Sequence, residues 1–203
     1  MARVGLLGGT FDPIHLGHLI LAELAHDALK LDRVEFLVSN DPPHKPDSSV
    51  SPAGVRTEMV SLAIRGIPYF AVNASELERS GPSYTVETLT ALRTARPHDQ
   101  FVFIVGGDSL RDLPSWHRPA DVLRLARLAV IDRPGADYDL AALERGLPAL
   151  GTQLDHVPAP AIDISSTALR AMVRDGRSIR FQTVEAVRAF IEERGLYRDE
   201  RGT

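Results

Sequence analysis

Short apolar runs alternate with amphipathic stretches along most of the 203-residue chain. Each run is rich in aliphatic or β-branched residues and is bounded by turn residues, which predicts a buried strand. The predicted strands are Val4–Leu7, Val34–Val38, Phe70–Asn73, Phe101–Val105, Leu128–Ile131 and, as a weaker candidate, Leu154–Val157.

The stretches between these strands have helical spacing. Apolar residues recur every three or four positions in Leu16–Leu29 and in Ala53–Arg65, where Arg56 reads as a surface charge. Strands that alternate with helices predict right-handed βαβ units and an α/β fold with a doubly wound parallel sheet. We expect the strand order 3-2-1-4-5.

The last third of the chain changes character after Pro158–Pro160. It predicts two helices, Ser166–Arg174 and Val184–Arg194, with Thr183 as the N-terminal signal of the second and no strand after them. We therefore expect a core at 1–160 and a small C-terminal helical cap at 161–203 within a single domain. Two long loops, Asn40–Pro52 and Leu77–Ser83, are candidate mobile substrate loops.

Composition narrows the function classes. A net charge of −4 disfavours nucleic acid as the main partner. The absence of cysteine excludes disulfides and thiolate-bound metals, so any metal must use oxygen or imidazole ligands. The first apolar run is too short for a signal peptide or a membrane span, so we expect a cytoplasmic protein without a membrane partner. The sequence leaves the oligomeric state open, a homodimer included.

The segment Gly8–His18 joins the first predicted strand to the first helix. Phosphates bind at this point of an open parallel sheet, because helix-terminal N–H groups face the crevice at the strand ends. Gly8 and Gly9 allow a close approach of the backbone, but neither a P-loop nor a GxGxxG pattern is present. The segment therefore predicts an anion site for another kind of phosphate chemistry.

His15 and His18 are three residues apart at the start of this helix. They lie on one face, where both can donate hydrogen bonds to a polyphosphate. The alternative is a capping histidine beside a core histidine, and the sequence does not say whether either is protonated. A zinc site with Asp12 lacks a third ligand nearby in sequence.

A second anion site is predicted at Ile164–Arg170. Ser165, Ser166 and Thr167 stand where a helix begins, and Arg170 follows about one turn later. The alternative is an ordinary serine cap with a solvated arginine. Asp108, after the fourth strand, has two readings as well: an acceptor for a ribose or ring amide, or a helix N-cap.

The motif GTFDPIHLGH resembles the signature of the HxGH nucleotidyltransferase superfamily, and the whole chain resembles the bacterial nicotinate-nucleotide adenylyltransferases. The landmarks that follow in the family's order are Pro42–Lys45, Gly81–Leu89, Gly106–Leu110, Trp116, Arg133–Gly135, Ile164–Arg170 and Gly195–Tyr197. The resemblance implies a Rossmann-like nucleotidyltransferase fold.

The implied reaction transfers the adenylyl group of ATP to nicotinate mononucleotide, with release of pyrophosphate. ATP would carry Mg²⁺, held mainly by substrate phosphates and water rather than by protein ligands. His15 and His18 are the implied catalytic donors. The implied ATP-binding residues are Gly8, Gly9, Thr10, Phe11, His15, His18, Gly106, Asp108, Arg133, Ser165, Ser166 and Arg170. The implied acceptor-binding residues are Thr10, His44, Lys45, Tyr84, Thr85, Trp116 and His117.

Three alternatives remain open beside this one. The first is an adenylyltransferase whose acceptor is nicotinamide mononucleotide or phosphopantetheine. The second is a cytidylyltransferase, and the third is a nucleotide sensor without turnover. The segment Gly81–Thr85, the helix start at Ser165 and Trp116 favour a pyridine nucleotide. The intact histidines disfavour the sensor.

Overall fold

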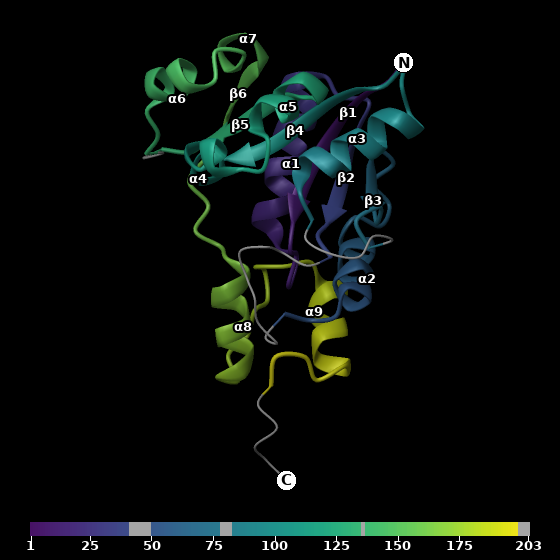
Figure 1. Cartoon of the computed structure of the whole chain (residues 1–203). Helices are drawn as coiled ribbons and strands as arrows, with labels where there is room; N and C mark the ends of the chain where they lie inside the picture. Colours follow the sequence, from purple (N-terminus) through teal and green to yellow (C-terminus); the bar gives the residue numbers. More distant parts are fainter. Residues whose placement is uncertain (41–49, 78–82, 135–136, 199–203) are drawn as a thin grey trace.

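A six-stranded parallel sheet forms the centre of the computed structural model, which describes residues 1–40, 50–77, 83–134 and 137–198. The strand order is β3-β2-β1-β4-β5-β6 (Figure 1). The bounds are β1 Arg3–Gly9, β2 Arg33–Val38, β3 Phe70–Asn73, β4 Gln100–Gly106, β5 Arg127–Asp132 and β6 Leu154–Pro158. The predicted fold class and the order 3-2-1-4-5 are confirmed, and the weaker strand candidate adds β6 beside β5.

Nine α-helices are described, together with one turn of 3₁₀ helix, Leu113–Ser115. They are α1 Leu16–Leu29, α2 Ala53–Ala63, α3 Thr85–Ala95, α4 Gly107–Arg111, α5 Pro119–Leu125, α6 Leu140–Gly146, α7 Leu150–Gln153, α8 Ser166–Arg174 and α9 Glu185–Glu193. The predicted bounds of α1 and α8 are confirmed. Among these described residues, no helix has both the length and the apolar character needed to cross a bilayer.

The sheet is covered on both faces, as its apolar strands require. Along β4, Val102 and Ile104 point to one face and Phe101, Phe103 and Val105 to the other. Helices α1, α2, α8 and α9 contribute to the first core, and α3 to α7 contribute to the second. The alternation of β4 therefore builds both layers from one strand.

The start of α9 differs from the prediction at Thr183. Val184 is the N-cap of α9 and makes no side-chain cap hydrogen bond. The buried Thr183 hydroxyl instead donates to the carbonyl oxygen of Ile14, 2.8 Å away. Thr183 thus ties the C-terminal helices to the loop after β1, which is a tertiary role that a local capping rule does not foresee.

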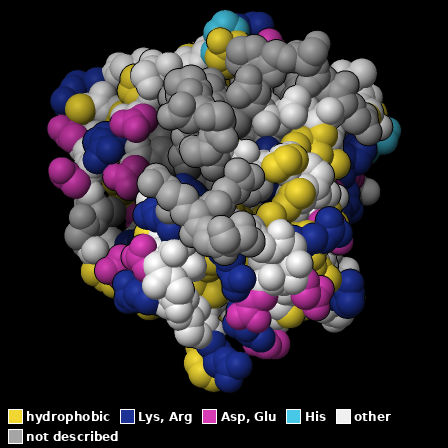
Figure 2. Space-filling model, turned by 90° about the horizontal axis from the view of Figure 1, so that it is seen from below, with side chains coloured by type: hydrophobic (Ala, Val, Ile, Leu, Met, Phe, Trp, Pro, Cys, Tyr) yellow, Lys and Arg dark blue, Asp and Glu magenta, His cyan; other side chains and the backbone are white. Residues whose placement is uncertain are grey.

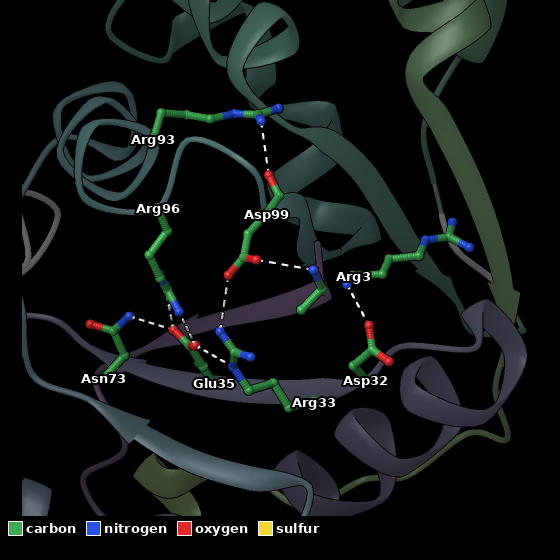
Figure 3. Close-up of polar contacts among 9 residues, drawn as sticks. Arg3, Asp32, Arg33, Glu35, Asn73, Arg93, Arg96 and Asp99 are labelled. Carbon is green, nitrogen blue, oxygen red and sulfur yellow. Dashed lines mark hydrogen bonds and ion pairs between the residues drawn. The ribbon is translucent and has the colours of Figure 1, made fainter.

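A buried carboxylate of β2 joins neighbouring segments of the sheet. Glu35 of β2 accepts hydrogen bonds from Arg33 at 2.8 Å, from Asn73 at 2.7 Å and from both terminal nitrogens of Arg96 (Figure 3). Arg33 also binds Asp99 at 3.2 Å. The network connects β2 and β3 to the turn between α3 and β4, from Arg33 at the start of β2 to Asn73 at the end of β3.

Candidate active site

The loop after β1 is held by hydrogen bonds to its backbone carbonyls. Arg56 of α2 donates to Thr10 O at 2.9 Å, and Arg170 of α8 donates to Asp12 O at 2.7 Å. The hydroxyl of Ser166 donates to Pro13 O at 2.9 Å. Together with the bond from Thr183, four side chains from distant segments fix this loop, so its shape depends on α2, on α8 and on the segment before α9.

His15 and His18 stack on each other at the start of α1. Their ring centroids are 3.7 Å apart and their planes differ by 23°. The backbone N–H of His15 donates to Nδ1 of His18 at 3.3 Å. Because Nδ1 is used as an acceptor, neutral His18 carries its proton on Nε2 and is a hydrogen-bond donor there.

Both histidines are neutral at pH 7. Burial, followed by the nearby charge of Arg133, lowers the pKa of His15 to about 4. Burial lowers the pKa of His18 to about 3, with further contributions from His15 and Arg133. The structure therefore answers the protonation question that the sequence leaves open, and it brings Arg133 near the histidine pair.

Small and strained positions shape the space around the pair. Phe11 has a left-handed backbone (φ 52°) and points the edge of its ring at His18, with 5.0 Å between centroids. A Cβ atom at Gly9 would lie 2.7 Å from the ring of Phe11. A Cβ atom at Gly17 would lie 3.0 Å from the ring of His15. Both glycines are thus required by the packing of aromatic rings.

The helix start at Ser165 has the predicted geometry. The Ser165 hydroxyl accepts a hydrogen bond from the N–H of Ala168 at 3.2 Å, which confirms the cap. Arg170 contacts both Asp12 O and, at 3.4 Å, the hydroxyl of Thr167. The alternative of a solvated arginine is wrong, because Arg170 is bonded to the loop after β1.

The residues predicted for the acceptor lie near β4. The rings of Tyr84 and His117 are 4.5 Å apart, and Trp116 packs edge-on against Phe103 at 5.9 Å. Phe103 in turn lies 3.2 Å from the position of a Cβ atom at Gly8. Trp116 therefore packs on a phenylalanine that lies beside Gly8, near the carboxyl end of β1.

Asp108 does not cap a helix. Gly106 is the N-cap of α4, and the exposed Asp108 carboxylate pairs with Arg111 at 3.2 Å. The N-cap reading is therefore wrong. Two of the predicted acceptor contacts, His44 and Lys45, lie outside the described residues.

Relatives of known family match nearly the whole chain. A protein of Thermomicrobium roseum is 44% identical over 198 residues, 98% of this chain and 92% of its own length. One of Roseiflexus sp. (strain RS-1) is 47% identical over 201 residues, 97% and 98% of the two chains. Both are named "Probable nicotinate-nucleotide adenylyltransferase". The chain belongs to the nicotinate-nucleotide adenylyltransferase family.

A broader family model also matches most of the chain, and a solved structure shares its fold. The model, described as Cytidylyltransferase-like, matches residues 6–172. The Plasmodium falciparum nicotinic acid mononucleotide adenylyltransferase complexed with NaAD has a TM-score of 0.78 at 18% identity, covers 97% of this chain and is itself covered to 98%, which shows the shared fold. The recognition from the motifs is confirmed, together with the implied adenylyltransferase activity in NAD biosynthesis.

Arg56 lies in a different environment of the enzyme from the one predicted. Arg56 is not a surface charge: it is 1% exposed and its guanidinium is surrounded by backbone carbonyls. The signal was present, because Arg56 lies three, four and seven residues before Met59, Val60 and Ala63, which are all buried. An arginine within a buried stripe indicates a bonded guanidinium rather than a solvated one.

Asp12 and Tyr197 also have roles in the enzyme that the motifs did not define. The carboxylate of Asp12 is buried and accepts hydrogen bonds from the N–H of Ser51 at 3.1 Å and from the hydroxyl of Tyr197 at 2.6 Å. Burial beside this carboxylate raises the pKa of Tyr197 above its ordinary value. Within the described ranges, no three His, Asp or Glu side chains are placed to hold a metal ion, so the zinc reading with Asp12 has no support there.

The enzyme carries mixed charge around the C-terminal helices. Figure 2 views the molecule from the end that carries α8 and α9, and Lys and Arg side chains alternate there with Asp and Glu. Charges of both signs are therefore interspersed on the described part of this face, and the net charge of the chain is −4.

The lowered histidine pKa values predict a pH dependence of stability. In the unfolded chain each histidine has a pKa near 6.5, so below that pH the unfolded chain binds protons that the folded pair does not bind. Stability from this source is therefore complete above pH 7 and falls as the pH drops below 6.5. Between pH 7 and pH 5 each histidine should lower the free energy of unfolding by on the order of 2 kcal/mol.

Urea unfolding at pH 5, 6 and 7 measures this effect. A double variant with His15→Asn and His18→Asn should show a flatter dependence of unfolding free energy on pH, and His98→Asn, at an exposed position, should match the wild type. An unchanged slope in the double variant would contradict the lowered pKa values.

Proposed function

We propose that the stacked histidines act directly in adenylyl transfer from ATP to nicotinate mononucleotide, with the neutral Nε2–H of His18 as a donor to the phosphate oxygens. The hydrogen bond from His15 N–H to His18 Nδ1 carries this proposal, because it fixes the donor on the side away from the backbone. A fixed donor that meets developing negative charge stabilises the transition state without reorganisation.

The attacking group in this reaction is the phosphate of the acceptor, which is already an anion at neutral pH. No general base is needed, and catalysis rests on positioning and on neutralisation of charge. A low pKa suits His18 to this task, since the ring keeps one donor and does not exchange its proton with the phosphates. His15 supports His18 by stacking, and we place the remaining ATP contacts at the loop after β1 and at Ser165–Arg170.

The acceptor is proposed to lie beside Tyr84, Thr85, Trp116 and His117. The indole face of Trp116 suits a pyridine ring. We propose that His44 and Lys45 bind the same substrate.

Mg²⁺ is proposed to enter with ATP. Asp12 is the buried carboxylate closest in sequence to the histidines, and its oxygens are bonded to Ser51 and Tyr197. This donor set fits an ion that is held by substrate phosphates and water. Since ATP is an intracellular metabolite, we place the reaction in the cytoplasm, and a homodimer is the oligomeric state to test first.

One assay tests the acceptor assignment. The purified protein is incubated with ATP, Mg²⁺ and one of three acceptors: nicotinate mononucleotide, nicotinamide mononucleotide or phosphopantetheine, with pyrophosphate release as the readout. We expect the highest kcat/KM with nicotinate mononucleotide. Preference for either of the other acceptors would overturn the assignment, and ATP binding without turnover on any of them would indicate a sensor.

A further inference from the structure

Arg56 connects three segments of the chain through one guanidinium group. Its Nε donates to Ser51 O at 2.8 Å, Nη1 to Thr10 O at 2.9 Å and Nη2 to Asn40 O at 3.2 Å. Thr10 lies in the loop after β1, Asn40 follows β2, and Ser51 precedes α2. A single planar group thus fixes the relative positions of the carboxyl ends of two neighbouring strands and the start of a helix.

Packing alone does not explain why the residue at position 56 is charged. The group is 1% exposed and, within the described residues, forms no ion pair with a carboxylate. Burial of a charge is costly, and an apolar side chain of similar volume fills such a position at lower cost. Met59 and Val60 of the same helix are fully buried and serve this packing role. What the guanidinium adds is a rigid fork of donors, which an apolar residue or a lysine cannot reproduce.

Asp12 connects the segments that Arg56 holds to the loop that leads to the histidines. Its buried carboxylate interacts electrostatically with Arg56 and binds the N–H of Ser51, the same residue whose carbonyl accepts from Arg56. Asp12 also lies in the loop that leads to His15. Arg56 and Asp12 together therefore fasten the start of α2 to the loop that carries the catalytic histidines.

We propose that Arg56 is a positioning residue for adenylyl transfer, which holds Thr10, Asn40 and Ser51 at the separation that the bound substrates require. This role rests on the proposed function of the loop after β1, and it deepens that function by assigning the geometry of the loop to a residue that contacts no substrate. Loss of the fork lets Thr10 and the end of β2 move apart, which misplaces the substrate phosphates relative to His18. Displacements of about 1 Å in such a site lower reaction rates by up to about 10²-fold.

The test compares Arg56→Lys with Val60→Ala. Lysine keeps the charge but reaches one carbonyl at a time, whereas Val60→Ala weakens the same helix from the same buried face without touching the three carbonyls. At matched loss of thermal stability, we expect Arg56→Lys to lower kcat/KM for nicotinate mononucleotide roughly tenfold or more, with part of the loss in KM. Val60→Ala should stay within about twofold of the wild type in both kcat and KM.

Calorimetric titration with ATP gives a second readout that does not need turnover. Arg56→Lys should weaken ATP binding and Val60→Ala should not. Equal effects of the two variants on kcat/KM and on ATP affinity would overturn the proposal in favour of a purely structural role, as would a wild-type kcat/KM in Arg56→Lys. A wild type that binds ATP but turns over no acceptor would refute the proposed function, while the titration would still test Arg56.

Discussion

Replacement of His18 by alanine should lower kcat by roughly 10²–10³-fold, the range seen when a single donor to a transition-state oxyanion is removed. The KM for ATP should change little, because the donor acts on charge that develops during transfer. The fold should persist, since His18 lies at the first turn of α1 and is only partly buried. Steady-state kinetics and circular dichroism measure the two effects.

Two further variants separate the nitrogens of His18. The side chain of His18→Gln places an amide donor near the position of Nε2, whereas His18→Asn offers an acceptor near Nδ1 and preserves the bond from His15 N–H. We expect His18→Gln to keep more activity than His18→Asn. His26→Ala, on the same helix, is the control and should be near wild type. A more active asparagine variant would show that the loop bond, and not the donor, is what catalysis needs.

The largest stability effect is expected at the buried carboxylate of Glu35. Glu35→Gln should lower the free energy of unfolding by about 3 kcal/mol, because the arginines that bind Glu35 lose their carboxylate in a buried setting. For a chain of this size the melting temperature should fall by roughly 6–12 °C. The kinetic constants should not change, since none of the residues in the network of Figure 3 belongs to the loop after β1 or to Ser165–Arg170.

The stability effect of Glu35→Gln should depend on pH. Burial raises the pKa of Glu35, but hydrogen bonds from Arg96, Arg33 and Asn73 outweigh it and leave the pKa below its ordinary value. The stabilisation is therefore complete above the unfolded pKa of 4.5 and is lost as the pH falls further. Glu35→Gln should therefore lower the free energy of unfolding more at pH 7 than at pH 3. Glu87→Gln, at an exposed position of α3, is the matched control. Equal losses in the two variants at pH 7 would contradict a special role for Glu35.

Much of the fold follows from local pattern. The run Phe70–Asn73 coincides with β3, and the spacing in Leu16–Leu29 coincides with α1, since each element buries a face that the sequence marks clearly. No bounds are predicted for helix α3, whose buried side includes a threonine, Thr88, among its apolar residues. That hydroxyl is satisfied by the buried Glu76, 2.8 Å away, a partner that the local pattern does not show.

The candidate site likewise has features that the sequence indicates and features that only the tertiary structure shows. By themselves, the sequence motifs indicated the family, which the relatives confirm, whereas the anion-binding role of the loop and the site residues stay predictions. Only the tertiary structure decided that His15 and His18 are neutral, because their pKa values depend on burial and on Arg133, more than one hundred residues away. The same holds for Arg56, whose partners come from three separate segments. Local sequence specifies which groups a segment carries, whereas charge state and hydrogen-bond partners are set by what the rest of the chain packs against them.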